Sequence, residues 1–506
     1  MKNSFVNPLD FFERFPHVTQ QIFKQLDKRS LKNCREVASR WQECIDDNNF
    51  LWIRIVKIPK IPKNGDTYLH IATKSGQTKI VETLMQKSKE MDFDLNATNE
   101  YGKTAFHLAC MNRFQIAKII VENSNVFKID LNARDLGDGL GMTGFHWACF
   151  NRHSKIVKLL MKKSTEFEID INAVNDEGYT AFHMACEMGR IKMVEMLLKK
   201  SVNLNINLNA RIERHDISGW TGFHLACLNG NSAVVKEIIR NSAKSKIDLN
   251  IRDSDGNSPF HLACWPSNNS DEDGNYIKSK IVKMIIEKSS QFKINLNIED
   301  WNGMTALHCA CSYQNLETVE VIMKKSLEFN IDLNAKSRGG ITPFHSAIED
   351  QRIVEKFILK SVKLKIDLNA RDNKGWTALH WACKQNISNT VEMILKLSKK
   401  FNIEVDIKDK NGLTPFHLAC REGKPWIAEI FVKYSAELNI DLNTEDNEGF
   451  TPLQWACLNG QSEIAELLIR KSTEFDINLN IKNSSDMTLF ELICREGNSD
   501  IGRSNF

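Results

Sequence analysis

The sequence repeats itself, and this regularity constrains the fold more than any other feature. The stretch TAFHLAC at 104–110 returns as TGFHWAC at 143–149, TALHWAC at 377–383 and TPFHLAC at 414–420. Twelve copies align on one column, most of them 37 residues apart. The column consists of His70, His107, His146, His183, His224, His261, His308, His345, His380, His417, Gln454 and Glu491. A fixed period of this length is typical of a repeat array, in which each repeat contacts only its neighbours.

Each repeat predicts two helices followed by an extended turn. Thr143 precedes an apolar segment at 145–150 and has the chemistry of a helix N-cap. A polar break at 151–154 leads to a second segment, KIVKLLMKKSTEFE, whose apolar residues recur at helical spacing. Asn and Gly residues then predict a turn before the next cap. We expect an all-α solenoid at 67–500, with short fingers between helix pairs and a tail at 501–506.

The pattern T-x-L/F-H-x-A, the glycine shortly before that threonine and the L-N-A-x-D turn resemble the ankyrin repeat, from about residue 64 to residue 500. The resemblance implies an ankyrin-type α-solenoid with β-turn fingers. The family's repeat has ~33 residues, and here four more precede the finger, as in STEF and SLEF. We expect them to add a turn to the second helix, with an aromatic ring packed into the stack. These rings are Phe127, Phe167, Phe292, Phe329, Phe401 and Phe475.

The histidine and the cysteine of each repeat lie three positions apart, on one helix face. One repeat offers one ligand of each kind, and packed helices are ~8–10 Å apart, whereas zinc–ligand bonds are ~2.0–2.3 Å. The cysteine column also accepts Thr73 and Ile348, as a packing position would. We therefore predict buried reduced thiols, histidines that bond to the backbone of the next finger, and no metal, cofactor or catalytic residue.

The charge balance and the apolar runs exclude other classes of protein. The 67 Lys and Arg residues nearly match the 64 Asp and Glu residues, which argues against an electrostatic nucleic-acid binder. No apolar run is long enough to cross a bilayer, and MKNSFVNPLDFFERF has acids and a proline where a secretory signal needs apolar residues. We expect a cytoplasmic or nuclear protein with no nucleic-acid or membrane partner.

The head of the chain, residues 5–56, does not follow the repeat. Its apolar residues recur every three or four positions, as in short amphipathic helices, and they exceed what so small a segment can bury. The pattern F-P-x-V-x-x-x-I-F-x-x-L, followed by L-x-x-C-R-x-V-x-x-R-W and L-W, resembles an F-box. It departs from that motif at Phe15, where leucine is usual before Pro16.

The F-box resemblance implies that the head binds the Skp-family linker subunit of a cullin–RING ubiquitin ligase. The alternative is a helical domain that only caps the array. Two prolines in KIPKIPKNGD, residues 57–66, predict a stiff, non-helical linker to the array. By position in the motif, the contacts with the linker subunit would come from Pro16, Val18, Ile22, Phe23, Leu26, Leu31 and Val37, with Trp41 and Trp52 partly internal.

A second column, between the finger glycine and the capping Thr or Ser, varies freely and includes Asp66, Lys103 and Trp220. We call it the variable column and expect it to reach the surface, because a packing position would not accept all three. Exposed aromatic residues contribute strongly to interfaces. The alternative is that each ring folds onto the neighbouring finger. We predict target-protein contacts at Tyr179, Trp220, Trp376 and Phe450 of this column, and at Trp301 in a finger.

These features predict a non-catalytic adaptor of a Skp–cullin–F-box ubiquitin ligase, whose array binds a target protein for ubiquitination. The alternative is an ankyrin scaffold, or a pathogen-type effector, that binds proteins without ubiquitin transfer. An enzyme has no supporting constellation of residues. The sixth repeat is ten residues longer than the period and contains WPSNNSDEDGNYIKS at 265–279. This segment is either a mobile polar loop or a partner-specific insertion.

Overall fold

A computed structural model describes residues 65–91, 94–135, 140–266, 272–482, 487–488 and 491. The predicted F-box and most of the linker lie outside the described residues. Contacts divide the chain into two bodies. The N-terminal body consists of the residues up to Ala148 together with the short segment Glu166–Ile169. The C-terminal body consists of Cys149–Thr165 and the residues from Asp170 onward. Over the described residues the chain forms eleven helix pairs and no named β-strand, which confirms the predicted all-α fold.

The first helix of each repeat begins at the predicted cap. Thr104 has an extended backbone, and its hydroxyl accepts a hydrogen bond from the N–H of His107. Proline directly follows the cap in α16, α20, α24 and α26, where it removes no helical hydrogen bond. The first helices are α6 (Tyr68–Lys74), α8 (Ala105–Asn112), α10 (Gly144–Phe150), α12 (Ala181–Glu187), α14 (Gly222–Leu228), α16 (Pro259–Cys264), α18 (Ala306–Ser312), α20 (Pro343–Ser346), α22 (Ala378–Lys384), α24 (Pro415–Arg421) and α26 (Pro452–Leu458).

The second helix of each repeat is amphipathic. In α23, Val391, Ile394 and Leu395 are buried, whereas Lys399 and Lys400 near its end are exposed. The second helices are α7 (Thr78–Met91), α9 (Phe114–Phe127), α11 (Ser154–Lys163), α13 (Ile191–Lys200), α15 (Ser232–Ser245), α17 (Glu272–Phe292), α19 (Leu316–Phe329), α21 (Gln351–Leu364), α23 (Ser388–Phe401), α25 (Pro425–Leu438) and α27 (Ser462–Arg470).

The four additional residues of each repeat extend most of the second helices by a turn, as predicted. Helices α9 and α19 run to Phe127 and Phe329, whose rings are half-buried. A left-handed residue then ends each helix, Lys128 with φ 52° and Asn330 with φ 51°. In α11, α13 and α27 the corresponding residues form turns instead of continuing the helix.

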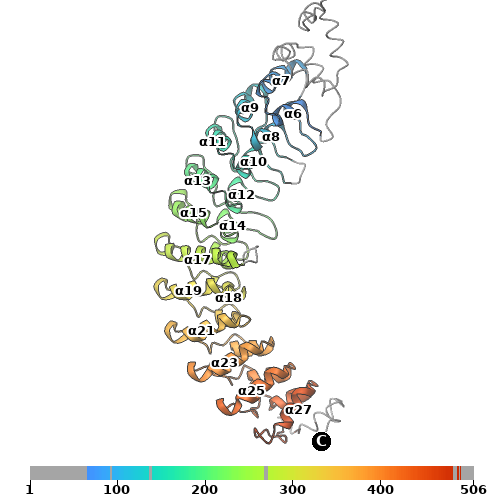
Figure 1. The fold of residues 1–506 in the computed structure, drawn as a ribbon, viewed down its shortest axis with the longest axis vertical. Helices are drawn as coiled ribbons and strands as arrows, with labels where there is room; N and C mark the ends of the chain where they lie inside the picture. The colour runs from blue at the N-terminus through green and yellow to red at the C-terminus, as the bar shows by residue number, and fades with distance from the viewer. Residues whose placement is uncertain are drawn as a thin grey trace, which may run out of the picture. The chain divides into compact units, whose positions relative to one another are not determined.

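Helices stack within each body. In the C-terminal body the second helices from α13 to α25 form one row and the first helices from α12 form another, each helix contacting the next of its row (Figure 1). In the N-terminal body α6 packs against α8 and α7 against α9. The core lies between the rows, where Phe416 of α24 meets Phe431 of α25 with ring centroids 5.3 Å apart. No helix among the described residues is long and apolar enough to span a membrane.

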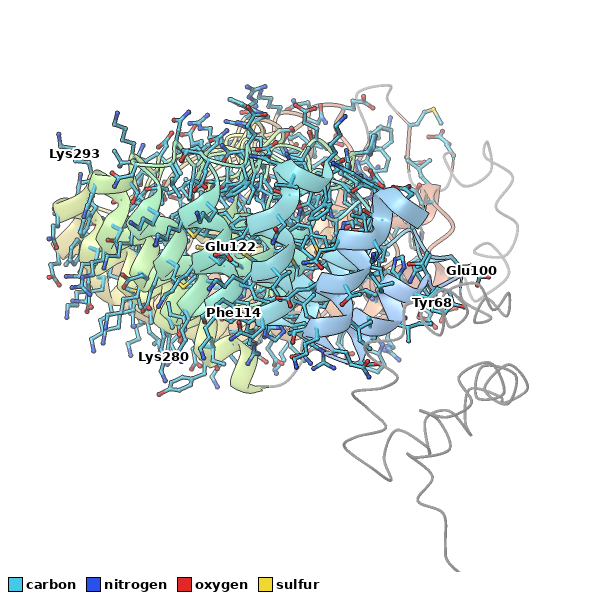
Figure 2. All side chains as sticks on the ribbon, turned by 90° about the horizontal axis from the view of Figure 1, so that it is seen from above. Tyr68, Glu100, Phe114, Glu122, Lys280 and Lys293 are labelled. Atoms are coloured by element: carbon cyan, nitrogen blue, oxygen red, sulfur yellow. The ribbon has the colours of Figure 1, made fainter. Side chains whose placement is uncertain are left out.

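The long helix α17 of the sixth repeat carries a fully buried lysine. Lys278 Nζ donates hydrogen bonds to the carbonyl oxygens of Cys227 (3.1 Å) and Leu262 (3.0 Å), near the ends of α14 and α16. Burial lowers the pKa of Lys278 to about 8. Lys280, two residues later, is exposed and points away from the helices (Figure 2). Lys278 therefore supplies donors to the carbonyls of two earlier helices.

Candidate protein-binding site

The histidine column ties each cap to the next finger. The N–H of Thr377 donates to Nδ1 of His380 (3.1 Å), and Nε2 of His380 bonds to the carbonyl oxygen of Leu413 in the following repeat (3.1 Å). The predicted bond between histidine and finger backbone is therefore confirmed. The same arrangement is present at His70, His107, His183, His224, His261, His308, His345 and His417.

These bonds require a neutral imidazole. Nδ1 accepts a backbone N–H, so the ring proton lies on Nε2 and is donated to the carbonyl. Burial lowers the pKa of His224 to about 3 and that of His380 to about 4. Gln454 reproduces both bonds without titrating: its Oε1 accepts from Thr451 N (2.9 Å) and its Nε2 donates to Ile481 O (2.8 Å). The column is thus a structural link between repeats.

The cysteine column packs inside the array. All ten cysteines among the described residues are buried, which confirms the predicted burial of these thiols. Burial raises the thiol pKa, for example that of Cys457 to about 12, so the unreactive thiol form prevails. Within the described ranges, no group of three or more His, Cys, Asp or Glu side chains could hold a metal ion.

The finger asparagines form a second link between repeats. Asn369 Nδ2 donates to Asn402 O (2.9 Å), and Asn369 Oδ1 accepts from Glu404 N (2.9 Å). Asn402 is the left-handed residue that ends α23. The same pair of bonds recurs at Asn96, Asn172, Asn209, Asn250, Asn297, Asn334 and Asn443.

The variable column does not project from the array, and the expectation of surface aromatics there was wrong. Tyr179, Trp220 and Trp376 are 7, 9 and 8 % exposed, and Phe450 is half-buried. The tryptophans follow the alternative, in which each ring folds onto the next finger. Trp220 Nε1 donates to Asp253 Oδ2 (3.1 Å), and Trp376 Nε1 donates to Asp409 Oδ2 (2.9 Å).

Polar members of the variable column are buried for a related reason. Lys103 Nζ lies 3.2 Å from Asp135 Oδ2, and Asp66 Oδ1 accepts from Asn99 Nδ2 (2.8 Å). A buried polar group is tolerated when it has a partner. The next finger supplies that partner to lysine, aspartate and tryptophan alike, so the column varies without reaching the surface.

Trp301 remains an accessible aromatic side chain. It is 47 % exposed, its Nε1 donates to Ser254 O (2.9 Å), and the Arg252 guanidinium lies 5.0 Å from the ring centroid. A ring fixed on one edge and open on one face is a typical interface anchor. Its contact with a target protein stays a prediction.

The sequence reasoning missed a group of exposed cations on three successive fingers. Lys336, Arg371 and Lys408 occupy the same finger position in consecutive repeats, 35 and 37 residues apart. Because the three cations recur at one position of the repeat, this group could have been found from the sequence. We call the three segments 336–338, 371–374 and 408–410 the basic fingers.

Family models identify both parts of the chain. Ankyrin-repeat models match residues 49–135, 127–211, 273–337, 327–409 and 397–483, and a further ankyrin-repeat model matches 218–250. Because these matches cover well over half of the sequence, the chain belongs to the ankyrin-repeat family. An F-box-like model matches residues 16–58, so an F-box-like domain precedes the repeats. Both predicted resemblances are confirmed.

Among solved structures, the chain is similar to the ankyrin repeat domain of Bcl-3, described as a unique member of the IkappaB protein family. The two share 20 % sequence identity with a TM-score of 0.40, over 51 % of this chain and 99 % of that one. No curated protein matches the sequence.

Proposed function

We propose that the protein is a non-catalytic, substrate-recognition adaptor of a Skp–cullin–F-box ubiquitin ligase. The observation that carries the proposal is the presence, in one chain, of an F-box-like domain at 16–58 and ankyrin repeats over the following residues. Both are protein-interaction modules. The head would bind the Skp-family linker subunit and the array a target protein, in the cytosol or nucleus.

The described residues support a binding role for the array. The histidines are neutral and bonded on both ring nitrogens, and the cysteines are buried thiols with raised pKa values. These groups are occupied in holding repeats together. Ubiquitin transfer would be performed by the other subunits of the ligase, to which the adaptor brings the target.

Co-purification from cells with the linker subunit and cullin tests the role of the head. Leu26 lies in the middle of the predicted docking helix, so Leu26→Asp would place an unpaired charge in an apolar interface, at a cost of several kcal/mol. We expect this variant to lose the linker subunit while the helical circular dichroism of the array is unchanged.

Gln25→Asp is the matched control, because it adds the same charge one residue away, at a position that the F-box pattern leaves open. It should retain the linker subunit. Recovery of the linker subunit by Leu26→Asp would contradict the docking surface. If the wild-type chain also fails to recover it, the protein is a scaffold or effector that acts without ubiquitin transfer.

A further inference from the structure

The basic fingers concentrate positive charge on one part of the array. Their six cations, which are all exposed, are Lys336, Arg338, Arg371, Lys374, Lys408 and Lys410. Within the described part of the chain, none of them forms an ion pair. The whole chain has a net charge of only +3, so this cluster is a local feature.

The two acidic residues of the basic fingers are directed inward. Asp372 and Asp409 are each 7 % exposed. Asp372 Oδ1 accepts from the N–H groups of Lys374 and Trp376, both at 2.8 Å. Asp409 Oδ2 accepts from the Trp376 indole (2.9 Å). These carboxylates serve the finger structure, so the exposed charged residues of the segments 336–338, 371–374 and 408–410 are all cations.

Backbone contacts hold three of the cations in a row along the stack. Lys336 Nζ donates to Arg371 O (3.3 Å), an Arg371 guanidinium N–H donates to Lys408 O, and Lys408 Nζ donates to Glu445 O (2.7 Å). Each side chain therefore reaches the equivalent residue of the next finger. Side chains that are already ordered lose less conformational entropy when a ligand binds.

Acidic fingers border the row on both sides. The position of Lys336, Arg371 and Lys408 is filled by Glu299 in the preceding finger and by Glu445 in the following one, and both glutamates are exposed. A negatively charged ligand is attracted over three fingers and repelled beyond them. With neighbouring repeats ~10 Å apart, the attractive span is ~20 Å, which matches about six extended residues at ~3.3 Å each.

A hollow between the second and third basic fingers offers a place for an acidic side chain. Its volume is about 450 Å³, and its lining includes Lys374, Lys410 and Trp376. Arg421, which is paired with Glu422, and Asp409, which accepts from the Trp376 indole, also line it. Lys374 Nζ lies 5.0 Å from the Trp376 ring centroid, which positions the ammonium group at this hollow. Carboxylates bind to such sites through charge-assisted hydrogen bonds.

From these observations we infer that the basic fingers bind an acidic segment of the target protein, about six residues long, in an extended conformation. The inference rests on the proposed function, because it specifies what the array recognises. A nucleic acid is less suitable, since a continuous phosphate backbone would also run over the acidic flanking fingers.

Fluorescence anisotropy with the purified full-length chain tests the inference. The probe is a labelled peptide of six glutamates, compared with the same peptide made of glutamines and with single-stranded DNA of similar length. We expect the glutamate peptide alone to bind, with an affinity that falls as salt is raised. No ligase subunit is present, so this result is independent of the test on Leu26.

Charge reversal supplies the decisive comparison. The variant Arg338→Glu, Lys374→Glu, Lys410→Glu should weaken peptide binding about tenfold or more. The control Lys324→Glu, Lys363→Glu, Lys399→Glu makes the same charge change at exposed lysines of α19, α21 and α23, in the same three repeats. The control should stay within about twofold of wild type.

Equal weakening by both triple variants, absence of binding to the glutamate peptide, or tighter binding to DNA would each overturn the inference. Circular dichroism confirms that each variant is folded. The milder variant Arg338→Gln, Lys374→Gln, Lys410→Gln serves if charge reversal prevents folding, and it should still weaken binding more than the control does.

Discussion

In most repeats the histidine column bonds to the backbone of the variable column in the next repeat. The two columns nevertheless differ in which side chains they accept. His345 bonds to the carbonyl of Trp376, and His70 bonds to the carbonyl of Lys103. The backbone of the variable column thus performs a constant task, whereas its side chain is free to change if the next finger offers a partner. Variation along a repeat column therefore does not identify a surface.

Of the experiments that distinguish the histidine column from the variable column, acidification should have the largest effect on stability. Unfolded histidine binds a proton near its ordinary pKa of 6.5, whereas burial keeps the pKa of His308, His380 and His417 at about 4. Their contribution to stability is complete above pH 6.5 and falls as the pH drops towards 4. Full protonation would cost roughly 3 kcal/mol for each histidine. We expect cooperative loss of helical circular dichroism in this pH window.

A glutamine series provides the control for this prediction. His308→Gln, His380→Gln and His417→Gln together should keep both hydrogen bonds, as Gln454 does, and remove three titrating rings. The variant should unfold at a lower pH than wild type. The charged side chains that act on His380, namely Asp409, Asp372 and Arg371, are unchanged in this variant. An unchanged acid midpoint would show that carboxylates, rather than histidines, cause the acid sensitivity.

Trp376 should be the most sensitive side chain of the variable column. Trp376→Ala removes a buried ring and the indole hydrogen bond to Asp409, and should lower the free energy of unfolding by about 3–5 kcal/mol. Trp376→Phe keeps most of the ring and should cost about 1–3 kcal/mol, the penalty for an unpaired buried acceptor. Urea denaturation measures both. A surface role would be indicated if the alanine variant were as stable as wild type.

Trp301→Ala should have the smallest effect on stability. The ring is 47 % exposed and its hydrogen bond to Ser254 O lies at the surface, so we expect a loss of about 0.5–1 kcal/mol in the same denaturation experiment. Its predicted effect on affinity for the target is larger, about 2 kcal/mol. A marked loss of stability would place Trp301 among the structural aromatics with Trp376.

The fold could be predicted from the sequence because its determinants are local. The period, the capping threonine and the histidine three residues later define the first helix, as at Thr377 and His380. The burial of Trp376 could not be predicted in the same way, because its partner Asp409 lies 33 residues further on. A comparison of the residues at one position of the repeat does not reveal pairs between two different positions. The predicted head residues, including Leu26, lie outside the described residues.

The sixth repeat shows how this architecture accepts extra chain. His261 still bonds to the carbonyl of Met304, although 43 residues separate them instead of the 33 between His224 and Asn257. Helix α17 contains part of the added length, since it has 21 residues whereas α19 has 14, and the buried Lys278 fastens α17 to the carbonyls of two earlier helices. The connection between α16 and α17 is therefore a suitable site for the insertion of additional residues. A guest sequence such as a fluorescent reporter, placed between Pro266 and Glu272, would leave the links on either side in register.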